Sequence, residues 1–172
     1  VRAAMLDAAV AGERRFVDGV EFQFQMASGT EAPAEMTIYL PQFRVLDSAE
    51  IACPLLHNVL TLRGAQVRDP KKWATVLNEM IALYGDKTDV LIAQHNWPRW
   101  GQEDAVQLLA DQRDLYEFIN DQTLNLMNHG YTATEIAEMI ELPENLSQLW
   151  YVRGYYGTLS HDVKAVYQRY LG

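Results

Sequence analysis

The chain has 172 residues, of which 49% are hydrophobic and 22% charged, and its formal net charge is −9. This composition is ordinary for a globular protein with a real core, and the acidic balance disfavours nonspecific binding to nucleic acid or to anionic membranes. No apolar run approaches the roughly 18 residues of a membrane span, and the lone Cys53 excludes an internal disulfide framework. An anionic substrate would therefore need a local positive centre, either a metal ion or an arginine.

The first segments have the patterns of strands and turns. Residues 20–26 alternate apolar and polar side chains, which predicts a strand with one buried face. A turn is expected at residues 28–30. Residues 36–40 are rich in β-forming side chains and stop at Pro41, and residues 43–46 form a candidate third strand.

A helix is predicted to begin at Asp69 and Pro70, because Asp caps the free amides and Pro is tolerated in the first turn. Residues 90–93 then form a short apolar strand, which places His95 just beyond its C-terminal end. A strand, a helix and a strand with polar residues beyond the strand ends predict an α/β layout. Apolar residues recur at helical spacing up to Gly85, at Trp73, Val76, Leu77, Met80, Ile81 and Tyr84.

The pattern changes after Gly101 and becomes helical. Residues 102–128 contain neither Pro nor Gly and predict one helix, which is expected to stop at His129-Gly130. Thr132 and Glu135 have the spacing of a capping box, with Ile136, Met139 and Ile140 on one face of the next helix. Short helices are expected at 146–150 and 162–170. We therefore expect two domains, residues 1–101 and residues 102–172.

Two glutamates and a histidine lie near strand ends or turns in separate elements. Glu31 follows a Gly-Thr turn and precedes Pro33, and Glu50 and His95 come from other segments. Carboxylate oxygens and an imidazole nitrogen suit Zn²⁺ or a similar divalent ion. The four histidines of the chain lie far apart in sequence, so a metal site here would need further ligands from elsewhere.

Arg63 is a candidate anion clamp, because a planar and permanently charged guanidinium matches the oxygens of an anionic group. The alternative is a surface arginine paired with an acid. His57 is either a residue that supports the site or a structural histidine held by hydrogen bonds. We expect a capping role for His129 and assign none to His161, which is expected in a loop.

Two further groups are predicted to be structural. Trp97 and Trp100 would form an aromatic wall beside His95 and are expected to pack rather than to contact substrate. The acidic series at Asp111, Asp114 and Asp121 is expected to be a solvated or salt-bridged helix face, not a metal site.

Several motifs in the same order make the chain similar to a known family. They are Gly29-Thr-Glu-Ala-Pro-Ala-Glu-Met36, His57-Asn58, Leu62-Arg-Gly-Ala65, Val67-Arg-Asp69, His95-Asn-Trp-Pro-Arg-Trp-Gly101, Gln112-Arg-Asp114, Tyr116, Asp121-Gln-Thr123, Arg153-Gly-Tyr-Tyr-Gly157 and 163–172. From about Gly12 to Gly172 the chain resembles the alkylsulfatases of the metallo-β-lactamase superfamily. Residues 1–10 carry no such resemblance.

The resemblance implies a fold and an activity. It implies that residues 1–101 are the C-terminal part of an αββα catalytic domain and that residues 102–172 are a helical dimerisation domain. The implied activity is zinc-dependent hydrolysis of alkyl sulfate esters to alcohol and sulfate by a homodimer with two zinc ions per site. A periplasmic or secreted location is also expected from the family.

The resemblance also assigns residues. Glu31, Glu50 and His95 would be metal ligands, with Glu50 bridging, and Asn58 and Arg63 would bind the sulfate group. The choice of Glu31 over Glu35 rests on the Thr-Glu-Ala-Pro motif alone.

The chain departs from the family in several places. The upstream His-x-His-x-Asp-His ligand motif does not occur in this sequence, so we expect an internal fragment that is inactive alone. Ser28 replaces a usual Pro and Asn96 a usual His, and the second change could alter the substrate pocket.

A non-catalytic role is the alternative. The helical half could act as a dimerisation or interaction module, pairing two subunits through apolar faces. Residues 132–140 also resemble the first helix of a helix-turn-helix protein. However, residues 141–146 contain acids and Pro143 where a recognition helix needs basic or amide side chains, so DNA binding is disfavoured.

Overall fold

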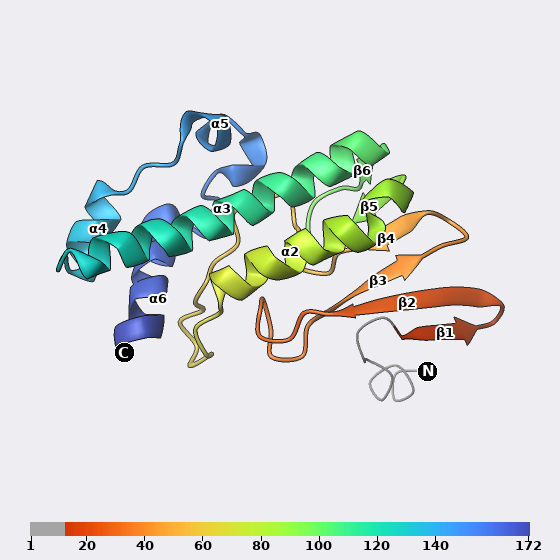
Figure 1. Ribbon diagram of the computed structural model, residues 1–172, viewed down its shortest axis with the longest axis horizontal. Helices are drawn as coiled ribbons and strands as arrows, with labels where there is room; N and C mark the ends of the chain where they lie inside the picture. Colours follow the sequence, from red (N-terminus) through yellow and green to blue (C-terminus); the bar gives the residue numbers. More distant parts are fainter. Residues whose placement is uncertain (1–12) are drawn as a thin grey trace.

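The computed structural model describes residues 13–172, and it contains one mixed β-sheet followed by helices (Figure 1). The part of the predicted first domain that falls on residues 1–12 lies outside the described residues. The strands are β1 (Arg14–Val17), β2 (Val20–Met26), β3 (Met36–Leu40), β4 (Val45–Asp47), β5 (Val90–Ile92) and β6 (Arg99–Trp100). The helices are α2 (Pro70–Tyr84), η1 (Gly85–Lys87), α3 (Gln102–Asn128), α4 (Ala133–Met139), α5 (Glu144–Ser147), η2 (Trp150–Val152) and α6 (Leu159–Leu171).

The sheet follows chain order from β1 to β6. Strands β1 to β4 pair antiparallel through short connections, whereas β4 and β5 pair parallel. Parallel neighbours need a crossover, and α2 supplies it, which confirms the α/β layout expected from the sequence. The predicted strands at 20–26 and 36–40 are confirmed as β2 and β3. The third strand begins at Val45, later than expected, because Phe43 and Arg44 belong to a turn in which Arg44 has a φ of 53°.

Helix α2 begins as predicted. The side chain of Asp69 accepts a hydrogen bond from the Lys72 amide at 2.9 Å, and Pro70 opens the first turn. Its buried face includes Trp73, Leu77 and Met80, which the helical spacing had indicated. The α-helix ends at Tyr84, but the chain continues into the 3₁₀ turn η1.

Helix α3 lies beside α2 and both cover the sheet (Figure 1). Its first turn contains Glu103 and Asp104, whose negative charges stabilise the helix because they lie at the positive end of its dipole. Its buried residues, among them Leu108 and Ile119, join one hydrophobic core with residues of the sheet and of α2. Side chains from both sides of the expected boundary at residue 101 thus share a core, and the two-domain division stays a prediction.

Helix α4 lies at the C-terminal end of α3 and packs against α6, whereas α5 lies farther back along α3 (Figure 1). The capping box of α4 is present, with Thr132 and Glu135 bonded reciprocally. Ile136 and Ile140 are buried as expected, but Met139 is exposed. The helix expected at 146–150 is instead the short α5 followed by η2, because Leu149 adopts an extended backbone between them.

Helix α6 begins at Leu159, earlier than expected, since Thr158 rather than a later residue caps it. No helix within residues 13–172 is long and apolar enough to cross a membrane.

Candidate metal centre and anion pocket

Three side chains from separate segments converge next to the edge where β4 and β5 end. One ligand atom each from Glu31, Glu50 and His57 lies within 4.8 Å of the other two. Glu31 comes from the turn after β2, Glu50 from the turn after β4, and His57 from the loop that leads toward α2. The set is compact enough to hold one divalent ion, and its oxygen and nitrogen donors suit zinc.

The predicted ligand His95 is not one of these three residues, but the parallel pairing of β4 and β5 explains why it lies against Glu50. Asp47 pairs with Ile92, and the ladder continues beyond the strands through a bond from the Gln94 amide to the Ala49 carbonyl at 3.0 Å. Glu50 and His95 follow these paired segments in equivalent places. Glu50 Oε1 consequently lies 2.9 Å from His95 Nε2.

Two residues beside Glu50 and His95 adopt the left-handed backbone region. Ala49, which precedes Glu50, has a φ of 50°, and Asn96, which follows His95, has a φ of 65°. Asn tolerates this region, but Ala does not favour it, and such strain gathers at functional sites. A bond from the Ala49 amide to Asp47 Oδ1 at 3.0 Å holds the turn that aims Glu50.

His57 is buried in this site. The sequence alone did not decide whether this histidine supports the site or is purely structural. Its Nε2 lies 3.1 Å from Glu50 Oε2 and 4.0 Å from Glu31 Oε1. Its Nδ1 lies 2.9 Å from the carbonyl oxygen of Asn58. Glu50 therefore lies between two imidazoles, one buried and one half-exposed.

The electrostatics of the site follow from these contacts. Burial opposes ionisation of Glu50, but hydrogen bonds with His57 and His95 outweigh it and lower the pKa of the carboxyl. Burial also lowers the pKa of His57, which favours the neutral imidazole that metals require. Burial raises the pKa of the Glu35 carboxyl to about 7, against the hydrogen bond from the Met36 amide. Glu35 is not part of the compact group.

Arg68 connects the turn of Glu31 to the loop of His57. No sequence pattern predicts this role for Arg68. Its guanidinium contacts both the carboxylate and the backbone carbonyl of Glu31. It also contacts the side-chain oxygen of Asn58 and donates to the Asn58 carbonyl at 2.8 Å. The arginine is buried, so this set of charge-assisted bonds fixes Glu31 relative to Asn58.

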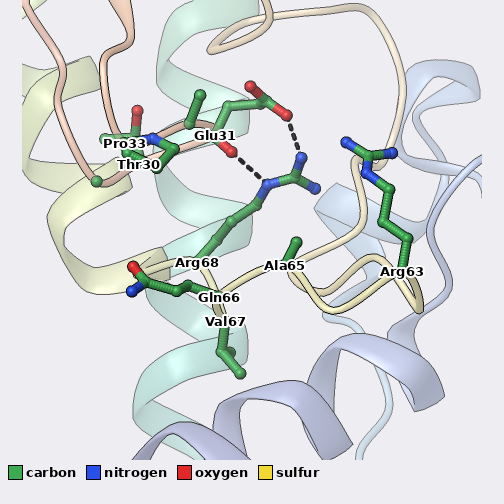
Figure 2. A pocket seen from close by; sticks show the side chains of 10 residues that line it. Thr30, Glu31, Pro33, Arg63, Ala65, Gln66, Val67 and Arg68 are labelled. Atoms are coloured by element: carbon green, nitrogen blue, oxygen red, sulfur yellow. Dashed lines mark hydrogen bonds and ion pairs between the residues drawn. The ribbon is translucent and has the colours of Figure 1, made fainter.

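A pocket of about 240 Å³ opens beside this arginine. Figure 2 shows Arg63 and Arg68 on its walls, with Arg68 bonded to Glu31 and Arg63 reaching toward the same region from the neighbouring loop. Arg63 is exposed and makes no salt bridge within residues 13–172. The expected alternative, a surface arginine paired with an acid, is thus not seen in this part of the chain.

For several other residues, the burial or the secondary structure differs from the prediction. Trp97 and Trp100 are 74% and 70% exposed, so the described chain does not bury them as a packed wall. Asp111 is buried and accepts a bond from the Tyr151 hydroxyl at 2.6 Å, so the prediction of a solvated or salt-bridged face is wrong for this residue. His161 lies in α6, not in a loop.

The remaining expectations of this kind agree with the structure. His129 is at the end of α3, with Nδ1 2.8 Å from the Asn125 carbonyl oxygen, as its capping role predicts. Asp114 and Asp121 form surface ion pairs with Arg113 and Lys71.

The sequence and the fold match known proteins. Residues 132–172 match the family model described as alkyl sulfatase dimerisation. The chain is 57% identical over 161 residues to an (R)-specific secondary-alkylsulfatase from a Pseudomonas species, a match that covers 93% of this chain and 24% of the relative. The chain is related to the alkylsulfatases. The family resemblance noted from the motifs is thereby confirmed.

Solved structures support the same relationship. The stereoselective inverting sec-alkylsulfatase Pisa1 from a Pseudomonas species superposes with a TM-score of 0.93 at 55% identity, over 95% of this alkylsulfatase-related chain and 26% of that structure. A metallo-beta-lactamase family protein from Thermus thermophilus has a TM-score of 0.55 at 18% identity, covering 95% of this chain and 48% of the other. The second likeness shows the fold alone. It agrees with the expected α/β fold followed by helices.

The alkylsulfatase-related chain spans about a quarter of the length of the relatives it matches. Among residues 13–172, the group of Glu31, Glu50 and His57 is a possible place for a metal ion.

Proposed function

We propose that the protein to which this chain belongs hydrolyses alkyl sulfate esters to an alcohol and inorganic sulfate. The observation that carries this proposal is a compact carboxylate and imidazole group beside an exposed arginine. It occurs in a chain with 57% identity to a secondary-alkylsulfatase. The chain spans only a quarter of that relative, so activity is proposed for the longer protein and not for this segment alone.

Zinc is the proposed metal, with two ions per site. Glu31, Glu50 and His95 would contribute ligands, together with residues outside this chain. The donor set fits, since the Glu50 carboxylate has one oxygen near each of two imidazoles and Glu31 has a second oxygen beyond its bond with Arg68. A bound zinc ion supplies Lewis acidity and lowers the pKa of bound water.

The protein's own residues would hold and orient the site. His57 contacts Glu50 Oε2 and so orients that carboxylate, while Arg68 restrains Glu31. Of the two arginines that line the pocket, Arg63 would hold the sulfate oxygens, because Arg68 already contacts Glu31 and Asn58. Asn58 lies on the same loop and would add a polar contact to the anion.

The helical segment would pair two copies of the protein. Its residues 132–172 match an alkyl sulfatase dimerisation model, and α4 and α6 carry exposed apolar side chains, Met139 and Leu171. We propose a homodimer on this basis. This is also the role that would remain if the site proved inactive.

The test is zinc content measured together with sulfate release from dodecyl sulfate and from a racemic secondary alkyl sulfate. Both would be measured on this chain and on the longest native form. We expect zinc and turnover in the long form, and a loss of turnover with zinc retained in Arg63→Ala. Arg113→Ala is the matched control, because Arg113 is on α3 and pairs with its neighbour Asp114.

The opposite result would change the conclusion. An absence of both zinc and turnover in the long form would overturn the proposed hydrolysis. Sedimentation analysis of the same samples would then test the dimerisation module, which needs no metal.

A further inference from the structure

The loop that carries His57 and Asn58 has no regular secondary structure, yet it is buried. Residues 55–59 are all buried, and none belongs to a helix or a strand. Buried backbone amides and carbonyls need hydrogen-bond partners. The partners of this loop therefore decide how its two site residues are aimed.

Helix α3 provides part of this support. The Tyr116 hydroxyl, fully buried, accepts a bond from the His57 amide at 3.3 Å. Gln112 donates from its side chain to the Leu55 carbonyl at 3.3 Å. One face of α3 thus contacts the backbone on the N-terminal side of Asn58.

Helix α6 and the residue before its cap provide the rest. Asp162 Oδ1 accepts a bond from the Val59 amide at 2.8 Å, although 103 residues separate them. The Gly157 amide donates to the Leu56 carbonyl at 2.8 Å. His161 Nε2 lies 2.8 Å from the Leu60 carbonyl oxygen. These contacts hold the loop on both sides of His57 and Asn58.

Gly157 shows how closely the two segments approach. A Cβ atom at this position would lie 2.7 Å from the Asn58 amide nitrogen and 2.7 Å from the His57 carbonyl carbon. These are backbone atoms, which cannot move aside as a flexible side chain can. Glycine is required here because the loop of the site packs directly against the backbone that leads into α6.

Asp162 lies in the first turn of α6, but its side chain accepts no hydrogen bond from its own helix among the described residues. Thr158 already caps α6 by accepting from the His161 amide. Asp162 is fully buried, one oxygen serves Val59, and the other has no hydrogen-bond partner within residues 13–172. Burying a carboxyl is costly, so its single directed bond to the loop is the function that the geometry indicates.

We propose that Asp162 is a positioning residue, which fixes the loop of His57 and Asn58 from helix α6. The helical segment then helps to build the site, in addition to any part it has in pairing subunits. That the loop is positioned for sulfate binding rests on the proposed function. The bond between α6 and the loop does not depend on it.

The test uses hydrogen exchange of the intact chain, read at residues 55–60 and compared with α2. Asp162→Ala removes the acceptor, and we expect exchange of this loop to rise about ten-fold while α2 changes little. Asp162→Asn keeps an oxygen that accepts from Val59, so it should restore protection. Thr158→Ala is the control, because it weakens the cap of the same helix without touching the loop.

A milder variant covers the case in which Asp162→Ala does not fold. His161→Ala removes only the bond to Leu60 from a partly exposed ring, and it should loosen the same loop. Unchanged exchange at 55–60 in both variants, or an equal rise in Thr158→Ala, would overturn the positioning role.

A second measurement separates this proposal from the proposed function. In the longest native form, Asp162→Ala should raise KM for an alkyl sulfate about ten-fold, with a smaller change in kcat and rescue by Asp162→Asn. If the wild-type protein hydrolyses no sulfate ester, the proposed function fails. The exchange result would still decide whether Asp162 positions the loop.

Discussion

Glu50 Oε1 lies 2.9 Å from His95 Nε2, although 45 residues separate the two in the chain. The contact exists because β4 and β5 are parallel neighbours and each delivers its next turn to the same edge of the sheet. On its other side the same carboxylate reaches His57 at 3.1 Å. The glutamate thus connects a half-exposed histidine to a buried one.

We predict that Glu50→Ala or His95→Ala abolishes zinc retention and turnover together in the longest native form. Either change removes a donor from a site whose ligands come from separate elements, so the remaining ligands should not hold the ion. Zinc content after dialysis and sulfate release measure the two effects.

His129→Ala is the matched control for these variants. Its imidazole is at the exposed C-terminal end of α3, and its one hydrogen-bond partner among the described residues is the Asn125 carbonyl. Normal zinc and activity in Glu50→Ala or His95→Ala would refute the site assignment.

Replacing the two arginines of the pocket should affect stability to very different extents. Arg68→Ala should lower the free energy of unfolding by about 3 kcal/mol, because it leaves the partly buried Glu31 carboxylate and the buried Asn58 without their partner. Arg63→Ala should change stability by less than about 0.5 kcal/mol, since Arg63 is exposed. Urea unfolding of the chain measures both.

Arg68→Lys sharpens this test. A lysine keeps the charge but cannot reproduce a planar fork that reaches Glu31 and Asn58 at once. We expect it to fall between wild type and Arg68→Ala. Full stability in Arg68→Lys would mean that charge alone, and not the fork, holds the two segments.

Stability should fall as pH rises across neutrality because of Asp162. Burial raises the pKa of this carboxyl to about 8, against a bond from the Val59 amide and the positive charge of Arg68. The folded chain then keeps a proton that the unfolded chain releases near pH 4. The resulting stability is complete below about pH 4 and is lost as pH rises toward 8, with a slope of up to about 1.4 kcal/mol per pH unit.

Asp162→Asn should remove that slope, since an amide does not titrate in this range. Thermal unfolding between pH 5 and 9 compares the two proteins. Tyr116 and Arg68 are the charged or titratable groups that act on Asp162 from the neighbouring segments, and both are retained in the variant. An identical slope in the variant would place the titration elsewhere.

The same substitution, Trp→Ala, at one buried and one exposed tryptophan tests the contribution of the core to stability. Trp73 is fully buried, stacks on Tyr116 with ring centroids 4.4 Å apart, and donates to the Ile51 carbonyl at 2.8 Å. Trp73→Ala should cost about 3–5 kcal/mol of unfolding free energy. Trp97→Ala, at a residue that is 74% exposed, should cost less than about 0.5 kcal/mol.

Local sequence determined the elements of this protein well. The cap at Asp69, the capping box at Thr132 and Glu135, and the uninterrupted helix 102–128 depend on neighbouring residues, so their patterns predicted the structure. Motifs in a fixed order also indicated the alkylsulfatase family and the glutamates and histidine of the candidate site. These features are encoded over short stretches of chain.

Only the tertiary structure decided which distant residues meet. Parallel pairing of β4 with β5 brings Glu50 to His95, and no periodicity in either strand specifies its partner. Burial of His57, the bonds of Arg68 and the support from Asp162 arise where α3 and α6 pack against a loop without secondary structure. Such contacts depend on the closure of long chain segments around one core, which a local pattern does not record.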